Sequence, residues 1–233
     1  MRKRIHRHGL TVLAMVLTLL APSLASAQAP TAGEALKKTT DEVLSVIEEA
    51  SDYVKEDPER YYRRVNEVLD DAVDFRGFAR GVMGEYASSQ RYRSLDEEGR
   101  KKLRDQLDRF TEAMRDGLVR TYSRGLLAFG GSRVELDRES STGSDDPDAS
   151  RATLRQLIYS DGSSDPYVVV YQMAKERDGK WLMRNLIVEN VNLGQIYRSQ
   201  FEAAARKFDG DLDKVIDDWA IEPVEEIEGE TKV

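Results

Sequence analysis

The chain contains no cysteine, and its only two histidines, His6 and His8, stand close to the N-terminus. Without cysteine there can be no disulfide, no thiolate nucleophile and no lipid anchor attached through a thioether. Beyond residue 8 the chain can therefore form neither a Ser-His-Asp or Cys-His catalytic group nor an ordinary zinc site. Catalysis by carboxylates alone and metal sites made of oxygen ligands stay open.

Long apolar runs are also missing. The longest, from Leu10 to Leu20, has 11 residues, whereas a membrane-spanning helix needs about 20. Four basic residues precede this run, and Ala25-Ser26-Ala27 follows it as a small-x-small sequence. A basic start, a short apolar stretch and small residues are typical of a secretory signal peptide. We therefore expect residues 1–27 to be removed by cleavage after Ala27 and residues 28–233 to be exported.

Basic residues are fewer than acidic residues. The chain has 35 Lys and Arg against 43 Asp and Glu, a net charge of −8. Removal of the four basic residues of the signal segment would leave 31 against 43, a net charge of −12. Such a chain is not expected to bind nucleic acid or anionic lipid surfaces non-specifically. Solubility is the simplest explanation of the acidic balance.

The first half of the chain has the three-to-four-residue apolar period of helices. Thr31 and Glu34 form a capping box, and Asp57-Pro58 starts a second helix with an N-cap and a residue that lacks an amide hydrogen. A short third helix runs from Asp74 to Gly84, and one long helix runs from about residue 96 to 129. The apolar stripes of the first two helices are Leu36, Val43, Ile47, Ala50 and Val54, then Tyr61, Val65, Val68 and Ala72.

The period then changes to the two-residue alternation of strands. The expected strands are residues 133–139, 151–160, 167–177 and 180–189, separated by turn-rich segments and by Asp178-Gly179. Helices follow at about residues 192–207 and after Asp211, and residues 221–233 form an acidic tail that we expect to be disordered. This order predicts one α+β domain over residues 28–220, with helices packed on one face of a curved four-stranded antiparallel sheet.

The stretch from Asp178 to Phe201 resembles the end of the sheet in the MlaC, or toluene-tolerance (Ttg2), family of periplasmic phospholipid-binding proteins. The matching residues are Trp181, Val191, Leu193, Tyr197, Arg198, Gln200 and Phe201, and the departures are Asn185, Asn190, Asn192 and Ile196. Two more segments resemble the family in the same order along the chain. They are residues 74–84, and Thr121-Tyr122 followed by Leu126.

The resemblance implies a periplasmic phospholipid carrier and not an enzyme. Such proteins hold acyl chains in a deep apolar cavity between helices and a cystatin-like or nuclear-transport-factor-like sheet, with the head group near solvent. They shuttle lipid between an outer-membrane lipoprotein–porin complex and an inner-membrane ABC transporter, of which they are an auxiliary component, and so maintain outer-membrane asymmetry. The resemblance implies bound phospholipid, no cofactor, no metal, no nucleic acid and a monomer.

Flexible and aromatic side chains tolerate mixed acyl chains, which selects candidates for the cavity wall. The expected lining residues are Phe75, Phe78, Val82, Met83, Met114, Leu118, Tyr122, Leu126, Val168, Val170 and Met183. On the third strand, alternation separates Val168 and Val170 from Tyr167, Val169 and Tyr171, and the valine face is our choice for the cavity. Arg76 and Arg80, one helical turn apart, could hold a head group, or they could pair with nearby acids.

Two other functions stay open. An enzyme without histidine on the same scaffold would carry a lone Asp or Glu inside the cavity. A periplasmic chaperone or carrier for lipoproteins or peptides would present an open apolar surface. Asp70, Asp71 and Asp74 could suggest a metal cluster, but helix capping and solvent exposure explain them better.

Overall fold

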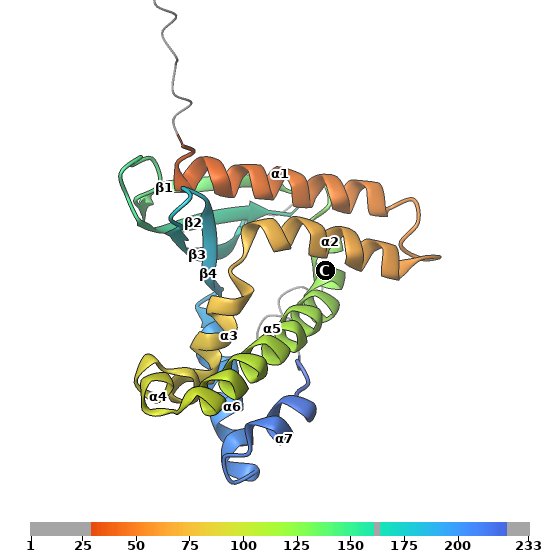
Figure 1. Ribbon diagram of the computed structural model, residues 1–233. Helices are drawn as coiled ribbons and strands as arrows, with labels where there is room; N and C mark the ends of the chain where they lie inside the picture. The colour runs from red at the N-terminus through yellow and green to blue at the C-terminus, as the bar shows by residue number, and fades with distance from the viewer. Residues whose placement is uncertain (1–28, 161–163, 223–233) are drawn as a thin grey trace, which may run out of the picture.

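The computed structural model describes residues 29–160 and 164–222. The expected signal peptide and the acidic segment from residue 223 onward lie outside the described residues. In Figure 1, α1 and α2 lie side by side along the top, the sheet stands next to them, and α3 to α7 form a second group of helices below. The order of helices, antiparallel sheet and helices is the α+β arrangement predicted from the sequence.

The first two helices begin where their capping residues predict. In α1 (Ala32–Ala50), the Thr31 side chain accepts from the Glu34 amide and Glu34 reaches back to the Thr31 amide, 2.8 Å away. In α2 (Pro58–Ala72), Asp57 accepts from the amide of Arg60. The expected apolar stripe of the first helix includes one residue that lies outside the helix. Helix α1 ends at Ala50, and Val54 lies in the turn that follows.

The next helices carry the chain away from the sheet and back again. Asp74 caps α3 (Phe75–Met83), which ends at Gly84 in a left-handed conformation with φ of 55°. A 3₁₀ turn, η1 (Gly84–Ala87), leads into α4 (Ser89–Ser94), a short helix that the sequence analysis missed. The long helix α5 (Glu97–Leu126) is unbroken and ends in the 3₁₀ turn η2 (Leu127–Phe129).

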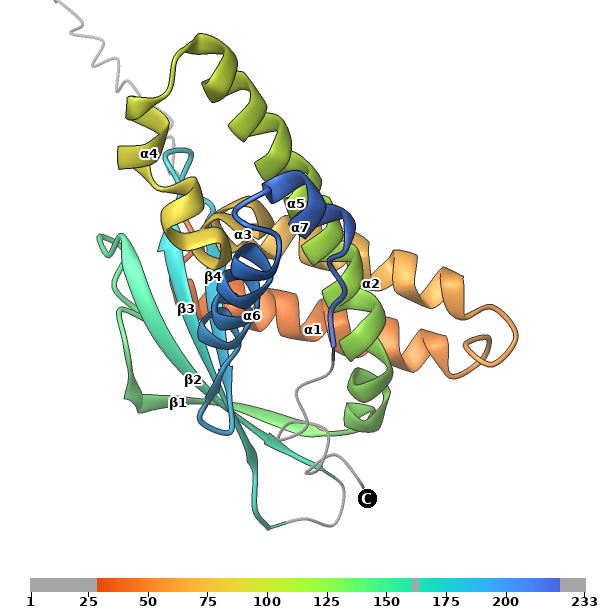
Figure 2. The ribbon, with the colours of Figure 1, turned by 90° about the horizontal axis from the view of Figure 1, so that it is seen from below.

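The sheet is an antiparallel meander in the order β1-β2-β3-β4-β5. The four expected strands are present as β1 (Arg133–Thr142), β2 (Arg151–Tyr159), β3 (Tyr167–Lys175) and β4 (Trp181–Val188). A fifth strand of two residues, β5 (Val191–Asn192), adds to β4 after a turn in which Glu189 and Asn190 have positive φ. Figure 2 shows the curved sheet on the left, with α6 beside β4.

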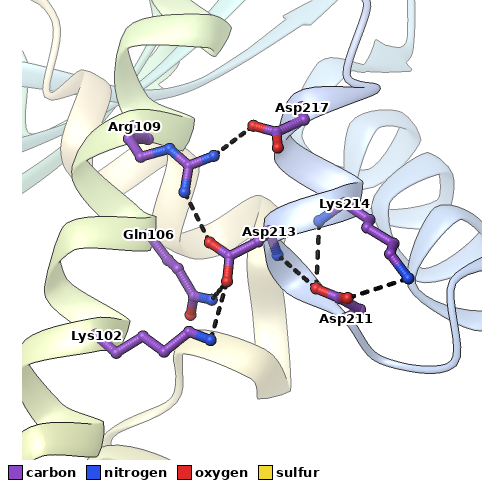
Figure 3. Close-up of polar contacts among 7 residues, drawn as sticks. All are labelled: Lys102, Gln106, Arg109, Asp211, Asp213, Lys214 and Asp217. Atoms are coloured by element: carbon purple, nitrogen blue, oxygen red, sulfur yellow. Dashed lines mark hydrogen bonds and ion pairs between the residues drawn. The ribbon is translucent and has the colours of Figure 1, made fainter.

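The last two helices follow the sheet, and α7 is held against α5 by polar contacts. Asn192 caps α6 (Leu193–Lys207), and Asp211 caps α7 (Leu212–Asp217). Asp213 of α7 accepts from Gln106 at 3.0 Å, and its carboxylate pairs with Lys102 at 3.0 Å and Arg109 at 2.7 Å (Figure 3). These contacts fix α7 against the first half of α5.

Three apolar clusters hold the described part of the chain together. The largest joins α3, α5, α6 and α7 around the fully buried Phe110, Met114, Tyr197 and Phe201. A second joins α1 to the sheet around Leu36, Leu154 and Trp181, and a third joins α1, α2 and α5 around Tyr61. Across the described ranges, no helix combines the length and the apolar character needed to cross a membrane.

The C-terminal boundary of the packed chain lies beyond the expected one. Ile221, the first residue of the expected tail, packs against the largest apolar cluster and lies over Gly117 of α5. Its carbonyl oxygen accepts from the Thr121 hydroxyl at 3.4 Å, and the carbonyl of Glu222 accepts from Tyr197. The packed chain therefore continues at least through these two residues.

Candidate functional site

A cavity of about 970 Å³ lies between the sheet and helices α1, α2, α3 and α5. This volume is at the upper end of the range of small-molecule sites, roughly 300–1,000 Å³. Most of the wall is apolar. The chain leaves this space unfilled because the largest apolar cluster packs on the other side of α3, among α5, α6 and α7.

The sheet contributes residues of β1 to β4 to the cavity. On β3 the lining residues are Tyr167, Val169 and Tyr171, which alternate with Val168 and Val170. Their cross-strand neighbours also line the cavity: Ile158 opposite Tyr167, Val188 opposite Val169, and Leu186 opposite Tyr171. Register therefore produces a continuous apolar surface across β2, β3 and β4.

The helices supply the remaining walls. Helix α1 contributes Leu36, Thr39, Thr40, Val43, Leu44 and Ile47. Helix α2 contributes Tyr62 and Leu69, and α3 contributes Phe75 and Phe78. The second half of α5 lines the cavity with the stretch from Leu118 to Leu126.

Polar groups in the wall bond to one another. The Tyr171 hydroxyl donates to Gln156 Oε1 at 2.9 Å, the Gln156 amide donates to the Thr40 hydroxyl at 3.0 Å, and that hydroxyl donates to the Leu36 carbonyl at 2.9 Å. Burial raises the pKa of the Tyr171 phenol, so it stays neutral. Because each of these groups already has a hydrogen-bond partner in the protein, none of them needs a polar atom of a ligand.

One ion pair in the wall, between Glu59 and Arg120, lies at exposed positions. Both carboxylate oxygens of Glu59 accept from Arg120, at 2.7 and 3.0 Å, and both side chains are more than half exposed. The hydrogen bond from Arg120 lowers the pKa of Glu59. Next to this pair, Arg124 donates to the Tyr62 hydroxyl at 3.2 Å. This side of the cavity is its charged rim.

The structure brings six of the eleven expected lining residues together in the cavity wall. They are Phe75, Phe78, Leu118, Tyr122, Leu126 and Met183. Val82, Met83 and Met114 are fully buried in the largest apolar cluster and are not part of the wall. Helical spacing marks them as buried, but it does not distinguish a packed core from a cavity.

For β3, the choice of face in the sequence analysis differs from the structure. Val168 and Val170 lie on the face away from the cavity, and Val169 with its two flanking tyrosines lies on the cavity side. Alternation separates the two faces correctly, but helices α1 and α5 decide which of them is covered.

Sequence reasoning also missed the contributions of α1 and α2. Val43 and Ile47 of α1 were recognised as an apolar stripe and were not assigned to the cavity. The sequence does contain a signal for this role, because Leu44 widens the apolar face of the helix beyond the single row of Val43 and Ile47. A helix that faces both a core and a cavity needs such a wider apolar face.

Arg76 and Arg80 do not line this cavity. Together with Arg93, Arg104 and Arg184 they line a second hollow of about 580 Å³, which we call the arginine pocket. Arg76 forms an ion pair with Asp108, as one of the two alternatives predicted. Arg184 lines both hollows.

The acidic residues near α3 have structural partners. Asp74 caps α3 through the Gly77 amide at 2.8 Å and pairs with Arg184, and Asp71 pairs with Lys180 at 2.7 Å. Among the residues that the structure describes, no group of three or more acidic or other ligating side chains is placed to hold a metal ion.

Comparison with known proteins identifies the family. The sequence profile of the MlaC protein family matches residues 37–220. The chain belongs to the MlaC family. The resemblance stated from the sequence is thus confirmed, and of the residues that carried it, Trp181, Leu193, Tyr197 and Phe201 are buried.

Two known proteins show the extent of the similarity. The toluene tolerance protein ttg2D of Pseudomonas putida is 28% identical over 214 residues, which cover 92% of this chain and 89% of that protein. The solved structure of a phospholipid-binding protein from Ralstonia solanacearum, in complex with a phospholipid, aligns with a TM-score of 0.63 and 19% identity. It covers 80% of this chain and 97% of that one. This structural likeness shows a shared fold.

Two of the four departures from the family pattern, Asn185 and Asn192, bond to each other. The Asn185 amide donates to Gln172 Oε1 at 3.1 Å and to Asn192 Oδ1 at 3.0 Å, and Asn185 Oδ1 accepts from the Gly194 amide. Asn192 also caps α6. In this MlaC-family chain these asparagines tie β4 to the start of α6.

Proposed function

We propose that the protein is a phospholipid carrier whose cavity encloses acyl chains. The observation that carries the proposal is the large, mostly apolar cavity, in whose wall Tyr171, Gln156 and Thr40 bond to one another and the Glu59–Arg120 pair lies at an exposed rim. Such a wall gives an acyl chain an apolar surface to contact and requires no particular polar group from it. The head group would then stay close to solvent.

The energetics of lipid in water explain why a carrier of this kind is needed. Each methylene exposed to water costs about 0.8 kcal/mol, so a phospholipid with roughly 30 methylenes would need about 24 kcal/mol to cross water alone. A cavity that replaces the bilayer interior removes most of this cost. The free energy of transfer between membrane and carrier can then lie near zero, which permits both loading and release.

Membership of the MlaC family supports this function, as does the shared fold with a protein solved in complex with a phospholipid. We further propose that the signal segment 1–27 directs residues 28–220 to the periplasm as one lipid-binding domain of the cystatin-like or nuclear-transport-factor-like type. There it would exchange lipid with an inner-membrane ABC transporter and an outer-membrane lipoprotein–porin complex and so maintain outer-membrane asymmetry. The name of the toluene tolerance relative fits such a role.

The alternatives have less support. A histidine-free enzyme would need a lone buried carboxylate in the cavity. The two carboxylates among the described lining residues both have partners: Glu59 pairs with Arg120, and Glu189 accepts from the Val168 amide. A lipoprotein or peptide chaperone predicts an open apolar surface. In the described chain, Tyr92, which is 36% exposed, is the one large hydrophobic side chain that is exposed to solvent.

Native mass spectrometry of the exported chain, followed by organic extraction, tests the proposal. The expected result is an added mass equal to one or two phospholipids, with the same lipids recovered in the extract. A chain that carries no lipid and takes none from phospholipid vesicles would contradict the carrier function and bring the enzyme and the chaperone forward.

A further inference from the structure

The arginine pocket stands out against the charge of the chain. Residues 76–104 contain eight Lys and Arg and four Asp and Glu, whereas the whole chain has a net charge of −8. Helices α3, α4 and α5 and strand β4 bring five of the arginines to the pocket: Arg76, Arg80, Arg93, Arg104 and Arg184. Segments distant in the sequence thus combine to make one concentrated positive region.

Much of this positive charge is not neutralised by the protein. Arg76 pairs with Asp108, and Arg184 pairs with Asp74 and Glu176. Arg80, Arg93 and Arg104 form no ion pair with any residue of the described ranges. Arg104 donates instead to the neutral Tyr92 hydroxyl at 2.6 Å. Three guanidinium groups therefore line one hollow without a carboxylate partner.

One nitrogen of Arg184, a residue that lines the pocket, is buried and lacks a partner among the described residues. Within the described ranges, Arg184 Nε has no hydrogen-bond acceptor, although the two terminal nitrogens of the same guanidinium are both paired. A buried donor without an acceptor costs free energy, so an oxyanion placed beside Arg184 would be favoured. Arginine clusters of this kind bind phosphate groups, because the planar guanidinium donates two parallel hydrogen bonds to them.

Helix α3 separates this pocket from the apolar cavity. Phe75 and Phe78 face the cavity, while Arg76, Gly77 and Arg80 face the pocket. The two hollows share Arg184. A phospholipid whose chains lie in the cavity would meet positive charge first at this residue.

We propose that the arginine pocket is a second binding site, which takes a phosphate group. The phosphate belongs either to the head group of the lipid carried in the cavity or to a free phosphate ester. The first of these sources rests on the proposed function. Both sources share the same chemistry, a tetrahedral oxyanion held by Arg80, Arg93 and Arg104 with Arg184 at the boundary.

The test uses the full exported chain and a matched pair of double variants. Arg80→Gln with Arg93→Gln removes two unpaired charges from the pocket. Arg63→Gln with Arg206→Gln removes two exposed charges elsewhere that likewise lack an ion pair within the described chain. Inorganic phosphate, glycerol 3-phosphate and neutral glycerol are titrated into each protein while the arginine side-chain NMR signals are followed. Each protein is also loaded with phosphatidylglycerol, and its lipid mass is measured.

Each source of phosphate predicts its own result. If free phosphates are the source, both phosphates shift the signals of Arg80 and Arg93 and glycerol does not. The pocket variant then binds them about tenfold or more weakly than the wild-type and the control. If the lipid head is the source, soluble phosphates have no effect, and lipid loading shifts these signals.

The proposal is overturned if neither soluble phosphate nor loaded lipid shifts the signals of Arg80 and Arg93. Where native mass spectrometry finds lipid bound in that experiment, only the arginine pocket fails and the carrier function stands. Where no lipid is bound and phosphate also has no effect, both fail.

Discussion

At the scale of single residues, function depends on which face of a strand a side chain occupies. Ile158 and Leu157 are neighbours on β2, both apolar and both partly buried, but Ile158 lines the cavity and Leu157 does not. Because successive side chains of a strand point to opposite faces, one position separates a cavity residue from an outward one.

Ile158→Glu is expected to abolish lipid uptake, whereas Leu157→Glu is expected to retain it. A carboxylate at position 158 can be hydrated while the cavity is empty, but a bound acyl chain would bury it without a partner. Lipid mass after incubation with vesicles should fall at least about tenfold for the first variant. Equal uptake by the two variants would show that the cavity is not where lipid binds.

Sequence reasoning reached this scale only in part. The spacing of Phe75, Phe78, Leu118 and Leu126 placed them on apolar faces, and these residues do line the cavity. The same spacing also selected Val82 and Met114, which lie in the packed core. Core and cavity cannot be told apart locally, because the difference is whether another element fills the space opposite.

At the scale of elements, helix ends are the most predictable feature. Thr31 and Asp57 are predicted N-caps, and they, like Asp74 and Asp211, each accept a hydrogen bond from the first turn of their own helix. Capping is predictable because its contacts span only three residues. Helix α4 was missed since it has no buried residue, and β5 was missed since its two residues form a strand only through pairing with β4.

Two glycines of α5 predict different stability effects. A Cβ at Gly125 would meet nothing within 4 Å, so Gly125→Ala should raise the free energy of unfolding by about 1 kcal/mol through helix propensity. A Cβ at Gly117 would lie 2.3 Å from Ile221 Cγ1. Gly117→Ala should therefore gain less or destabilise, because it displaces Ile221.

Urea unfolding of both alanine variants measures this difference. A double variant, Gly117→Ala with Ile221→Ala, should recover much of the propensity gain. If Gly117→Ala alone stabilises as much as Gly125→Ala, Ile221 does not pack on α5 as described.

The clamp between α5 and α7 predicts a dependence of stability on pH. The hydrogen bond from Lys102, with those from Gln106 and Arg109, lowers the pKa of Asp213 below its usual value (Figure 3). A carboxyl group whose pKa is lower in the folded state stabilises the fold above its unfolded pKa. That contribution is lost as the pH falls through the folded pKa.

Asp213→Asn should therefore lower the free energy of unfolding by about 1 kcal/mol near neutral pH, a modest figure because the side chain is one-third exposed and screened. The difference from wild-type should shrink as the pH falls through the lowered pKa of Asp213 in the folded state. Urea midpoints from pH 7 down to about pH 2 measure it, with Asp41→Asn, an exposed single pair, as the control. A difference that stays constant with pH would rule out a contribution from the Asp213 charge.

At the scale of the whole molecule, the chain separates a packed part from an open part. The cluster of α3, α5, α6 and α7 is packed around Phe110, Phe201 and Trp219, whose ring centroids lie 4.9 to 5.8 Å apart. The sheet with α1 and α2 encloses the cavity instead. The order of elements and the family could be predicted from the sequence, but this division could not, because it depends on the packing of segments far apart in the chain.

A ligand that fills the cavity should stabilise the whole fold. Lipid present at about 100 times its dissociation constant would add about 2.7 kcal/mol to the free energy of unfolding. For a chain of this size that corresponds to a rise in Tm of roughly 5–10 °C. Delipidated protein should therefore melt lower and recover on incubation with phospholipid vesicles, and Ile158→Glu should show no such shift. A Tm that is indifferent to lipid would contradict binding to the folded state.

The central claim, that acyl chains lie in this cavity, is tested most directly by NMR contacts between a ¹³C-labelled phospholipid and the methyl groups of the protein. We predict contacts from the acyl methylenes to Leu126, Ile158 and Val169, and none to Leu157 or Val168. Contacts with the second pair and not the first, in a chain that mass spectrometry shows to be loaded, would place the lipid on the opposite face of the sheet and contradict the claim.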